Sequence, residues 1–162
     1  MIFVTIGTQK FPFDRLLKKI DELIESGFIE EKVIAQIGSS AYCPRFYEYT
    51  NYIKERRFSE LLAKSRIIIT HGGVGTITKG LTMHKKVLIV PRLKKYNEHV
   101  DDHQIEIAEI FYKMKYAMMC SDMDNLEKCI RELDAVKFRE YNFSYVNLAN
   151  YVQDYLISLK ER

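Results

Sequence analysis

A glycine-rich segment, His71-Gly72-Gly73-Val74-Gly75-Thr76, is the part of the chain whose residue types most clearly indicate ligand chemistry. It follows the apolar run 66–70 and precedes a segment that we predict to be a helix. Glycines let a backbone approach a ligand closely, and the free N–H groups at the start of a helix favour a phosphate. We therefore predict that a phosphate group is bound by Gly72, Gly73, Val74, Gly75 and Thr76.

This segment does not match the standard phosphate-binding motifs. The G-x-x-x-x-G-K-[ST] pattern is absent, and Thr78 occupies the third glycine position of the dinucleotide-binding fingerprint. The motif alone leaves open a second interpretation, a tight strand-to-helix turn without a ligand. His71 also has two interpretations. It is either a hydrogen-bonded core histidine or a catalytic donor that stabilises charge on a phosphate leaving group.

A second polar segment, from Pro91 to Gln104, follows the apolar run 87–90. Its side chains can hydrogen-bond to sugar hydroxyls, although a solvated helix start has a similar composition. His99 and His103 would share one face of a helix and, with Glu98 and Asp102, offer metal-binding groups. No H-E-x-x-H motif is present, so we expect no metal and no cofactor. The predicted substrate-binding residues of this segment are Arg92, Glu98, His99, Asp102, His103 and Gln104.

Strands and helices alternate along the predicted chain. Apolar, β-branched runs predict buried strands at 2–6, 33–37, 66–70 and 87–90, with short strands at 47–50 and 116–119. Helical spacing predicts helices over 13–24, around 107–114 and over 148–159. Ser59 is the predicted cap of a helix ending at Lys64, and Asp124 with Glu127 resembles a capping box. Alternation of this kind predicts an α/β fold, a Rossmann-like parallel sheet with helices on both faces.

The predicted sheet brings the polar segments together. Gly7 and Thr8 follow the first strand, the glycine-rich segment follows the strand at 66–70, and Arg92 lies just beyond the strand at 87–90. In open α/β sheets, ligands bind beyond the carboxyl ends of the strands. We therefore predict a single binding site that includes Gly7 and Thr8.

Length and composition exclude several classes of protein. The chain has 162 residues, which predicts one domain over 1–162. With 25 basic and 22 acidic residues the net charge is only +3, so no nucleic-acid partner is expected. Its three cysteines form no Cys-x-x-Cys pair and predict no disulfide framework. The sequence has no signal-peptide pattern and no run of the ~20 apolar residues that a membrane span requires, which favours a cytoplasmic location.

These segments resemble the C-terminal, donor-binding domain of glycosyltransferase family 28. The matching strings are Gly7-Thr8-Gln9, Phe13-Asp14-Arg15-Leu16, the His71–Thr76 loop and the stretch from Pro91 to Gln104. The chain is most similar to the soluble catalytic subunits of split bacterial polysaccharide glycosyltransferases. It is more distantly similar to the soluble subunit of the eukaryotic dolichol-linked N-acetylglucosaminyltransferase.

The resemblance implies one half of a GT-B fold. The glycine loop would hold a UDP diphosphate, and Gln104 with neighbouring acidic groups would hold the donor sugar. Many relatives have a ribose-binding glutamate three residues after the Ser/Thr of the glycine motif, where this chain has Lys79.

The function implied by the resemblance is transfer of a hexose, with galactose as the first choice. The donor would be a UDP-sugar and the acceptor a lipid-linked saccharide of capsular or exopolysaccharide synthesis. Two other functions remain open at this stage. One is a non-catalytic nucleotide-binding subunit that enhances a partner transferase. The other is a metal-dependent hydrolase that uses His99, Asp101, Asp102 and His103.

One domain supplies only one wall of a two-domain transferase cleft. We therefore expect a membrane-anchored partner subunit, which would recruit the chain to the inner face of the membrane. The predicted docking surface lies near the C-terminus, on a helix of about 143–160 and the residues before it. Aromatic and apolar side chains are favoured in such interfaces. The surface comprises Phe138, Tyr141, Tyr145, Leu148, Val152, Tyr155, Leu156 and Leu159.

Overall fold

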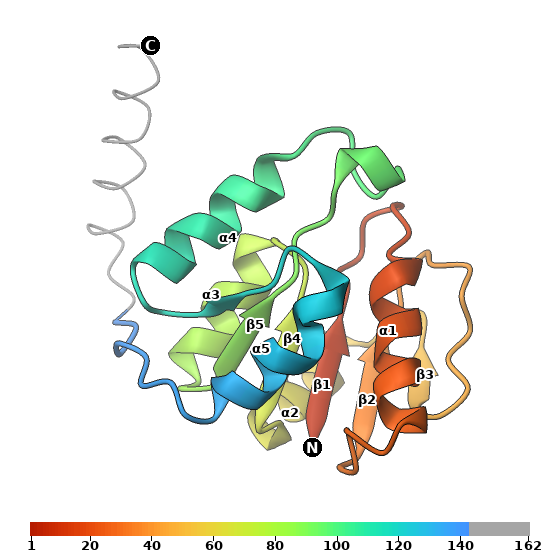
Figure 1. Ribbon diagram of the computed structural model, residues 1–162, viewed down its shortest axis with the longest axis horizontal. Coiled ribbons are helices and arrows are strands. Elements are labelled where there is room, and N and C mark those ends of the chain that lie inside the picture. The colour runs from red at the N-terminus through yellow and green to blue at the C-terminus, as the bar shows by residue number, and fades with distance from the viewer. Residues whose placement is uncertain (143–162) are drawn as a thin grey trace.

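The computed structural model describes residues 1–142, in which strands and helices alternate (Figure 1). The strands are β1 (Ile2–Thr5), β2 (Val33–Gln36), β3 (Glu48–Thr50), β4 (Ile67–Thr70), β5 (Lys86–Ile89) and β6 (Met118–Met119). The α-helices are α1 (Asp14–Glu25), α2 (Glu55–Lys64), α3 (Val74–Thr82), α4 (His103–Lys113) and α5 (Leu126–Leu133). Two 3-10 helices, η1 (Lys94–Tyr96) and η2 (Met123–Asn125), interrupt the loops. Within these residues no helix combines the length and apolar character needed to cross a membrane.

The strands form one parallel sheet in the order β3-β2-β1-β4-β5-β6. β1, β2 and β4 are buried along their whole length, as expected for strands that helices cover on both faces. β1 lies between β2 and β4, with Thr5 opposite Gln36 on one side and Thr70 on the other. This order is that of a Rossmann-like sheet, so the predicted fold class is confirmed.

Two layers of helices enclose the sheet (Figure 1). Helices α1 and α5 cover one face and pack on side chains such as Val4 and Ile69. Helices α2, α3 and α4 cover the other face and pack on the alternate side chains, including Phe3 and Ile68. Because successive side chains of a strand point to opposite faces, each apolar strand contributes to both cores.

The strand and helix assignments within residues 1–142 are largely confirmed, but two predicted caps are wrong. Ser59 lies inside α2, where its hydroxyl donates to the Glu55 carbonyl oxygen at 3.0 Å. Asp124 lies within η2, and its backbone N–H donates to Asp122 Oδ1 at 3.1 Å. In both places the chain turns into helical geometry earlier than predicted, so the expected cap becomes part of the helix.

The segment 39–57, for which the sequence pattern predicts only the short strand at 47–50, is ordered by contacts with α1. Asp21 is buried on that helix, and its carboxylate accepts hydrogen bonds from the Tyr42 hydroxyl and from the backbone N–H groups of Arg45 and Phe46. Asp14, at the start of the same helix, accepts from the N–H groups of residues 41 and 42. The predicted strand near 47–50 is confirmed as β3.

Most of the predicted docking surface, including the helix of about 143–160, lies outside the described residues. Of its members, Phe138 and Tyr141 are described, and both are half-buried against the domain itself. Tyr141 packs edge-on against Tyr116, with ring centroids 5.2 Å apart. Phe138 and Tyr141 therefore contribute to the domain's own core. The prediction of one domain over 1–162 stays a prediction for the last residues.

Candidate functional site

A cavity of about 530 Å³ opens where β1 and β4 lie side by side. The chain leaves β1 for α1 on one face and leaves β4 for α3 on the other, which makes this position the topological switch point of the sheet. Both Gly7 and the glycine-rich segment contribute to its walls, as the sequence predicted. The cavity is lined by Gly7, Thr8, Gln9, Gln36, Ile53, Glu55, Phe58, His71, Gly73, Gly75, Thr76 and Lys79.

His71 occupies a slot between the two glycine loops. Gly7 has a left-handed φ of +79°, and a Cβ at this position would lie 2.6 Å from Cε1 of the imidazole. A Cβ at Gly73 would lie 2.4 Å from its Nε2. Real Cβ atoms essentially never come this close to another heavy atom, so both loops need glycine in order to hold the ring. The imidazole thus connects the end of β1 with the start of α3.

Burial, together with the positive charge of Arg92, lowers the pKa of His71 to about 4. The side chain is only 7% exposed. At neutral pH the imidazole is therefore uncharged and cannot offer a positive charge to a phosphate, and its ring has a hydrogen bond to the Thr5 backbone.

The glycines of the 71–76 segment have different physical roles. A Cβ at Gly72 would lie 2.6 Å from the Cβ of Gln104, so this position is constrained by packing against α4. A Cβ at Gly75 would have nothing within 4 Å. The protein therefore does not itself require glycine at position 75, which is open to close approach by a ligand, whereas side chains at Gly72 and Gly73 would clash with the protein.

The start of α3 points its backbone N–H groups at the cavity without a side-chain cap. Its N-cap is Gly73, which has no side chain to bond them. Thr76 and Ile77 donate to the Gly73 carbonyl oxygen, while Val74 and Gly75, as first-turn residues, have no carbonyl of their own helix to bond. Uncapped N–H groups at the positive end of a helix dipole suit an anion.

Arg92 is completely buried beneath the loop that follows β1. Its Nη2 donates to the carbonyl oxygens of Ile6 at 2.6 Å and Phe11 at 3.0 Å. Its Nε and Nη1 have no hydrogen-bond partner among the described residues. Burial lowers the pKa of Arg92 to about 10, against the opposing effect of the Glu98 carboxylate. Arg92 therefore holds the loop after β1 through these two hydrogen bonds, and it has no exposed surface with which to contact a substrate.

Glu98 is also occupied within the protein. Its Oε1 lies 2.6 Å from Nε of Arg15, and its Oε2 accepts from the Leu93 backbone N–H at 2.9 Å. Arg15 in turn donates to the Pro91 carbonyl oxygen and lies over the rings of Phe13 and Tyr96. Arg15 was not among the predicted site residues, although it lies in one of the strings that carry the resemblance. Only the fold reveals that it supports the 91–98 loop.

Gln104 connects the two polar segments. Its Oε1 accepts from the backbone N–H groups of Gly72 at 3.0 Å and Arg92 at 3.1 Å, and the residue is 3% exposed. Asp102 accepts from the Lys94 N–H at 2.8 Å, which fixes η1. Both residues lie at the start of α4, which begins earlier than the predicted helix around 107–114, and these oxygens are already engaged in holding the loop.

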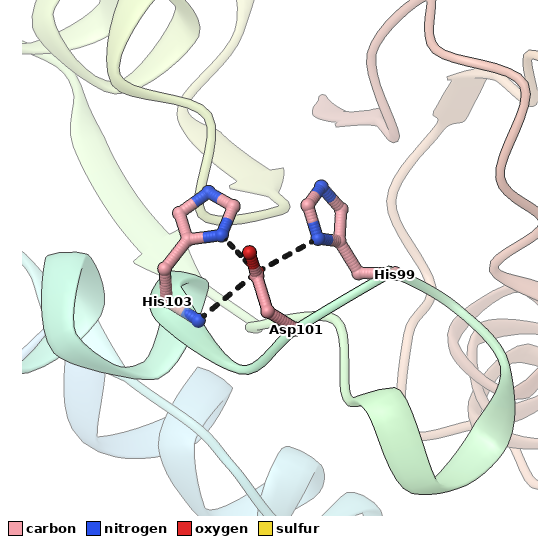
Figure 2. Close-up of side chains that lie close together, drawn as sticks. All are labelled: His99, Asp101 and His103. Atoms are coloured by element: carbon pink, nitrogen blue, oxygen red, sulfur yellow. Dashed lines mark hydrogen bonds and ion pairs between the residues drawn. The ribbon is translucent and has the colours of Figure 1, made fainter.

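His99, Asp101 and His103 form a cluster beside these residues (Figure 2). Nδ1 of His99 lies 3.0 Å from Asp101 Oδ1, and the same oxygen bonds Nδ1 of His103. The two histidines converge, but they do not share a helix face as predicted, because His99 lies in the loop before α4. Asp101 joins them in place of Glu98 and Asp102. None of the three residues lines the cavity at the switch point.

The outer wall of the cavity contains residues that the sequence did not single out. Gln36 donates to the Gly7 carbonyl oxygen at 3.2 Å and accepts from the Ile53 N–H at 3.1 Å, which joins two walls. Lys79 forms an ion pair with Glu55 on α2 and lies over the Phe58 ring. No local motif marks Glu55 or Gln36. They lie at the cavity only because the strands assemble in this order.

A larger hollow of about 960 Å³ lies on the other side of the 93–102 loop, next to the starts of α1 and η2. It includes Arg15, Glu98 and Asp102 but none of the glycine-rich segment. Size alone would favour this hollow as the binding site. The switch-point position, the glycines and the uncapped start of α3 favour the smaller cavity.

Comparison with known proteins is consistent with this geometry. The glycosyltransferase family 28 C-terminal domain matches residues 1–154. The UDP-N-acetylglucosamine transferase subunit ALG13 of Cryptococcus neoformans is 39% identical over 72 residues, 44% of this chain and 34% of that protein. The human protein of the same name is 27% identical over 139 residues, 74% of this chain and 11% of that protein. The chain thus spans about a third or less of these two relatives.

Solved structures show the same fold at low sequence identity. The kitacinnamycin glycosyltransferase superposes with a TM-score of 0.62 at 18% identity, over 83% of this chain and 35% of that one. The solution structure of ALG13 gives 0.57 at 19% identity, over 89% and 90% of the two chains. MurG of Acinetobacter baumannii gives 0.55 at 18% identity, over 81% and 40%. The predicted half of a GT-B fold is thereby confirmed.

Proposed function

The chain belongs to the glycosyltransferase family 28 C-terminal domain family, and we propose that it is the donor-binding subunit of a two-component transferase. In this proposal it binds a UDP-sugar in the switch-point cavity, and the assembled enzyme transfers the hexose to a lipid-linked saccharide. The observation that carries the proposal is the cavity itself, where an uncapped helix start and an open glycine, Gly75, face a volume of about 530 Å³.

The diphosphate would bind the N–H groups of Val74 and Gly75, beside Thr76 of the same turn and Gly7 and Thr8 on the β1 loop. Preorganised N–H donors stabilise negative charge that develops on a leaving group, and they do so without a metal ion. Neutral His71, whose ring bonds the Thr5 backbone, would contribute by holding the two glycine loops in position. We therefore keep the expectation that transfer requires no metal at the diphosphate.

The nucleoside would lie toward α2. Ile53 and Phe58 offer an apolar and aromatic wall against which a base can pack. The Glu55 carboxylate, held at the rim by Lys79, offers an acceptor for ribose hydroxyls. Glu55 would then do from α2 what a glutamate at position 79 does in many relatives.

The sugar would extend toward the start of α4, where His99, Asp102, His103 and Gln104 lie. Because Arg92 and Glu98 are buried in internal contacts, we assign them to positioning this segment. Galactose and a capsular or exopolysaccharide product are one choice, suggested by the resemblance to split bacterial enzymes. The names of the relatives favour N-acetylglucosamine as the other.

Calorimetric titration of the purified chain with UDP, UDP-galactose and UDP-N-acetylglucosamine in EDTA tests the proposal. We expect UDP to bind without a metal, and one of the two sugars to increase affinity. Gly75→Val should reduce UDP affinity about tenfold or more, because its side chain enters the diphosphate position. Thr82→Val places the same side chain at the exposed far end of α3 and should have no effect. Equal affinities for the two variants would contradict the assignment.

Two substitutions of Gln104 separate its role in the loop from a role in sugar binding. Gln104→Glu keeps the oxygen that accepts from residues 72 and 92 but removes the amide donor, so it should weaken UDP-sugar binding more than UDP binding. Gln104→Ala removes both, leaves two buried N–H groups unpaired and should also lower the unfolding free energy by about 1–3 kcal/mol. If Gln104→Glu weakens both ligands equally, the amide does not contact the sugar.

A further inference from the structure

We propose that His99, Asp101 and His103 form a binding site for a divalent transition-metal ion of the zinc class. The three side chains come from five consecutive residues of the loop that leads into α4 (Figure 2). One ligand atom from each lies within 4.8 Å of the other two. The inference concerns metal binding alone, at a cluster that shares His99 and His103 with the region proposed for the donor sugar.

The separation of the ligand atoms suits a small ion. Nδ1 of His99 lies 3.0 Å from Oδ1 of Asp101, and Nδ1 of His103 bonds the same oxygen. Tetrahedral zinc, with bonds of 2.0–2.2 Å, spaces its ligand atoms by roughly 3.3–3.6 Å. Small side-chain rotations would therefore open the cluster enough to admit the ion, without moving the backbone.

The types of ligand atom select the class of metal. Two imidazole nitrogens and one carboxylate oxygen suit zinc and its neighbours, whereas magnesium and calcium prefer oxygen ligands. One carboxylate and two neutral imidazoles carry a single negative charge, which complements a divalent cation. Three protein ligands also leave a fourth coordination position for water.

Burial gives the cluster one fixed ligand and two accessible ones. The His99 side chain is 7% exposed and packs on the Phe11 ring, with centroids 4.8 Å apart. The side chains of Asp101 and His103 are 55% and 46% exposed. An ion can therefore enter from solvent and bind against a ring that is already in place.

The site is separate from the proposed diphosphate position, because none of the three residues lines that cavity. Its effect would fall on the loop that carries it. His103 is the first residue of α4 and immediately precedes Gln104, which bonds Gly72 and Arg92. A bound ion would tie the loop to this helix start and raise the thermal stability of the chain.

The test is titration of the full, metal-stripped chain with zinc chloride by calorimetry, in the absence of nucleotide. We make it in a Cys43→Ser background, since Cys43 is an exposed thiol. We expect one ion per chain with micromolar affinity and a higher melting temperature. Asp101→Asn should weaken binding at least about tenfold. Asp102→Asn, the neighbouring carboxylate that bonds the Lys94 N–H instead, is the matched control and should bind zinc normally.

Two further measurements test the site even if Asp101→Asn does not fold. His103→Ala removes a half-exposed ligand at the surface and should also weaken zinc binding, whereas His84→Ala removes an exposed histidine outside the cluster and should not. Cobalt titrated in place of zinc should give a visible absorption band that both ligand variants lose. Absence of micromolar zinc binding, or an affinity that Asp101→Asn and His103→Ala leave unchanged, overturns the proposal. Either result leaves the UDP-binding proposal standing.

Discussion

At the scale of single residues, the site depends on the imidazole of His71, which fits because the residues on either side of it, Gly7 and Gly73, have no side chain. Its environment keeps it uncharged at neutral pH. The contribution of His71 to binding a diphosphate is therefore its shape, which holds the two glycine loops, and the positive electrostatic potential comes from the start of α3.

The lowered pKa of His71 makes a prediction about stability. An unfolded chain binds a proton on this imidazole below about pH 6.5, whereas the folded chain does so only below about pH 4. Between these values the unfolded state holds more protons, so the unfolding free energy should rise with pH and level off above about 6.5. The full effect is on the order of 3 kcal/mol.

Urea denaturation of the wild type and of His71→Gln at several pH values measures this contribution. The variant should show a smaller increase in stability between about pH 4 and 6.5, because glutamine does not titrate. His84→Gln is the control, since His84 is 68% exposed and should leave the pH dependence as it is. If His71→Gln reproduces the wild-type curve, His71 is not a neutral, buried group.

At the scale of elements, the 91–104 loop is held by residues from distant parts of the chain. Arg15 on α1 bonds both the Glu98 carboxylate and the Pro91 carbonyl oxygen. At the other end of the loop, Gln104 bonds Gly72 at the end of β4. The loop is thus fixed from both faces of the sheet, and its polar residues are arranged before any ligand binds.

Arg15→Met should destabilise the protein by about 3–5 kcal/mol, because it leaves the buried Glu98 carboxylate without its partner. Adding Glu98→Gln should restore part of the loss. Urea denaturation gives the free energies, and hydrogen exchange at residues 93–98 shows whether the loop opens. Lys113→Met breaks an exposed pair with Glu109 and serves as the control. A loss below about 1 kcal/mol for Arg15→Met would mean that the pair behaves as an exposed one.

The elements also show which features a sequence can predict. Strands such as Ile67–Thr70 are predictable because burial on both faces demands an uninterrupted apolar run. The segment 39–57 is not, because Asp21 orders it through contacts between residues more than 20 positions apart. The same limit applies to the site. Glycines following a strand are visible in the sequence, whereas Glu55 and Gln36 reach the cavity only once the strand order is known.

At the scale of the whole molecule, the chain provides one wall of the proposed enzyme. Two of the solved glycosyltransferase chains that share its fold are about two to three times longer, since this chain covers 35% of one and 40% of the other. In the two-component proposal, a second wall, the acceptor site and a membrane anchor come from a partner chain. Phe138 and Tyr141 pack on the domain itself, which leaves the residues after 142 as the proposed docking region.

Deletion of residues 143–162 should abolish co-purification with a co-expressed, membrane-anchored partner subunit, and glycosyl transfer with it. UDP affinity should persist, because every residue that lines the cavity lies before position 80. Ending the chain at residue 142 keeps the contact between Tyr141 and Tyr116. Acceptor-dependent transfer by the isolated intact chain would overturn the two-component proposal. Glycosyl transfer that survives Gly75→Val in the assembled pair would favour the alternative function, in which this chain is a non-catalytic subunit.

The slot around His71 has a consequence for how this sequence can change during evolution. One ring fills the space that side chains at positions 7 and 73 would need. A substitution at any of the three positions therefore affects which residues are tolerated at the other two. A side chain at position 73 becomes tolerable only after the residue at position 71 has become small. Homologues should therefore pair a bulky residue at 71 with two glycines, or a small residue at 71 with a side chain at 73. Position 7 should stay glycine in both groups, because its left-handed φ disfavours any side chain.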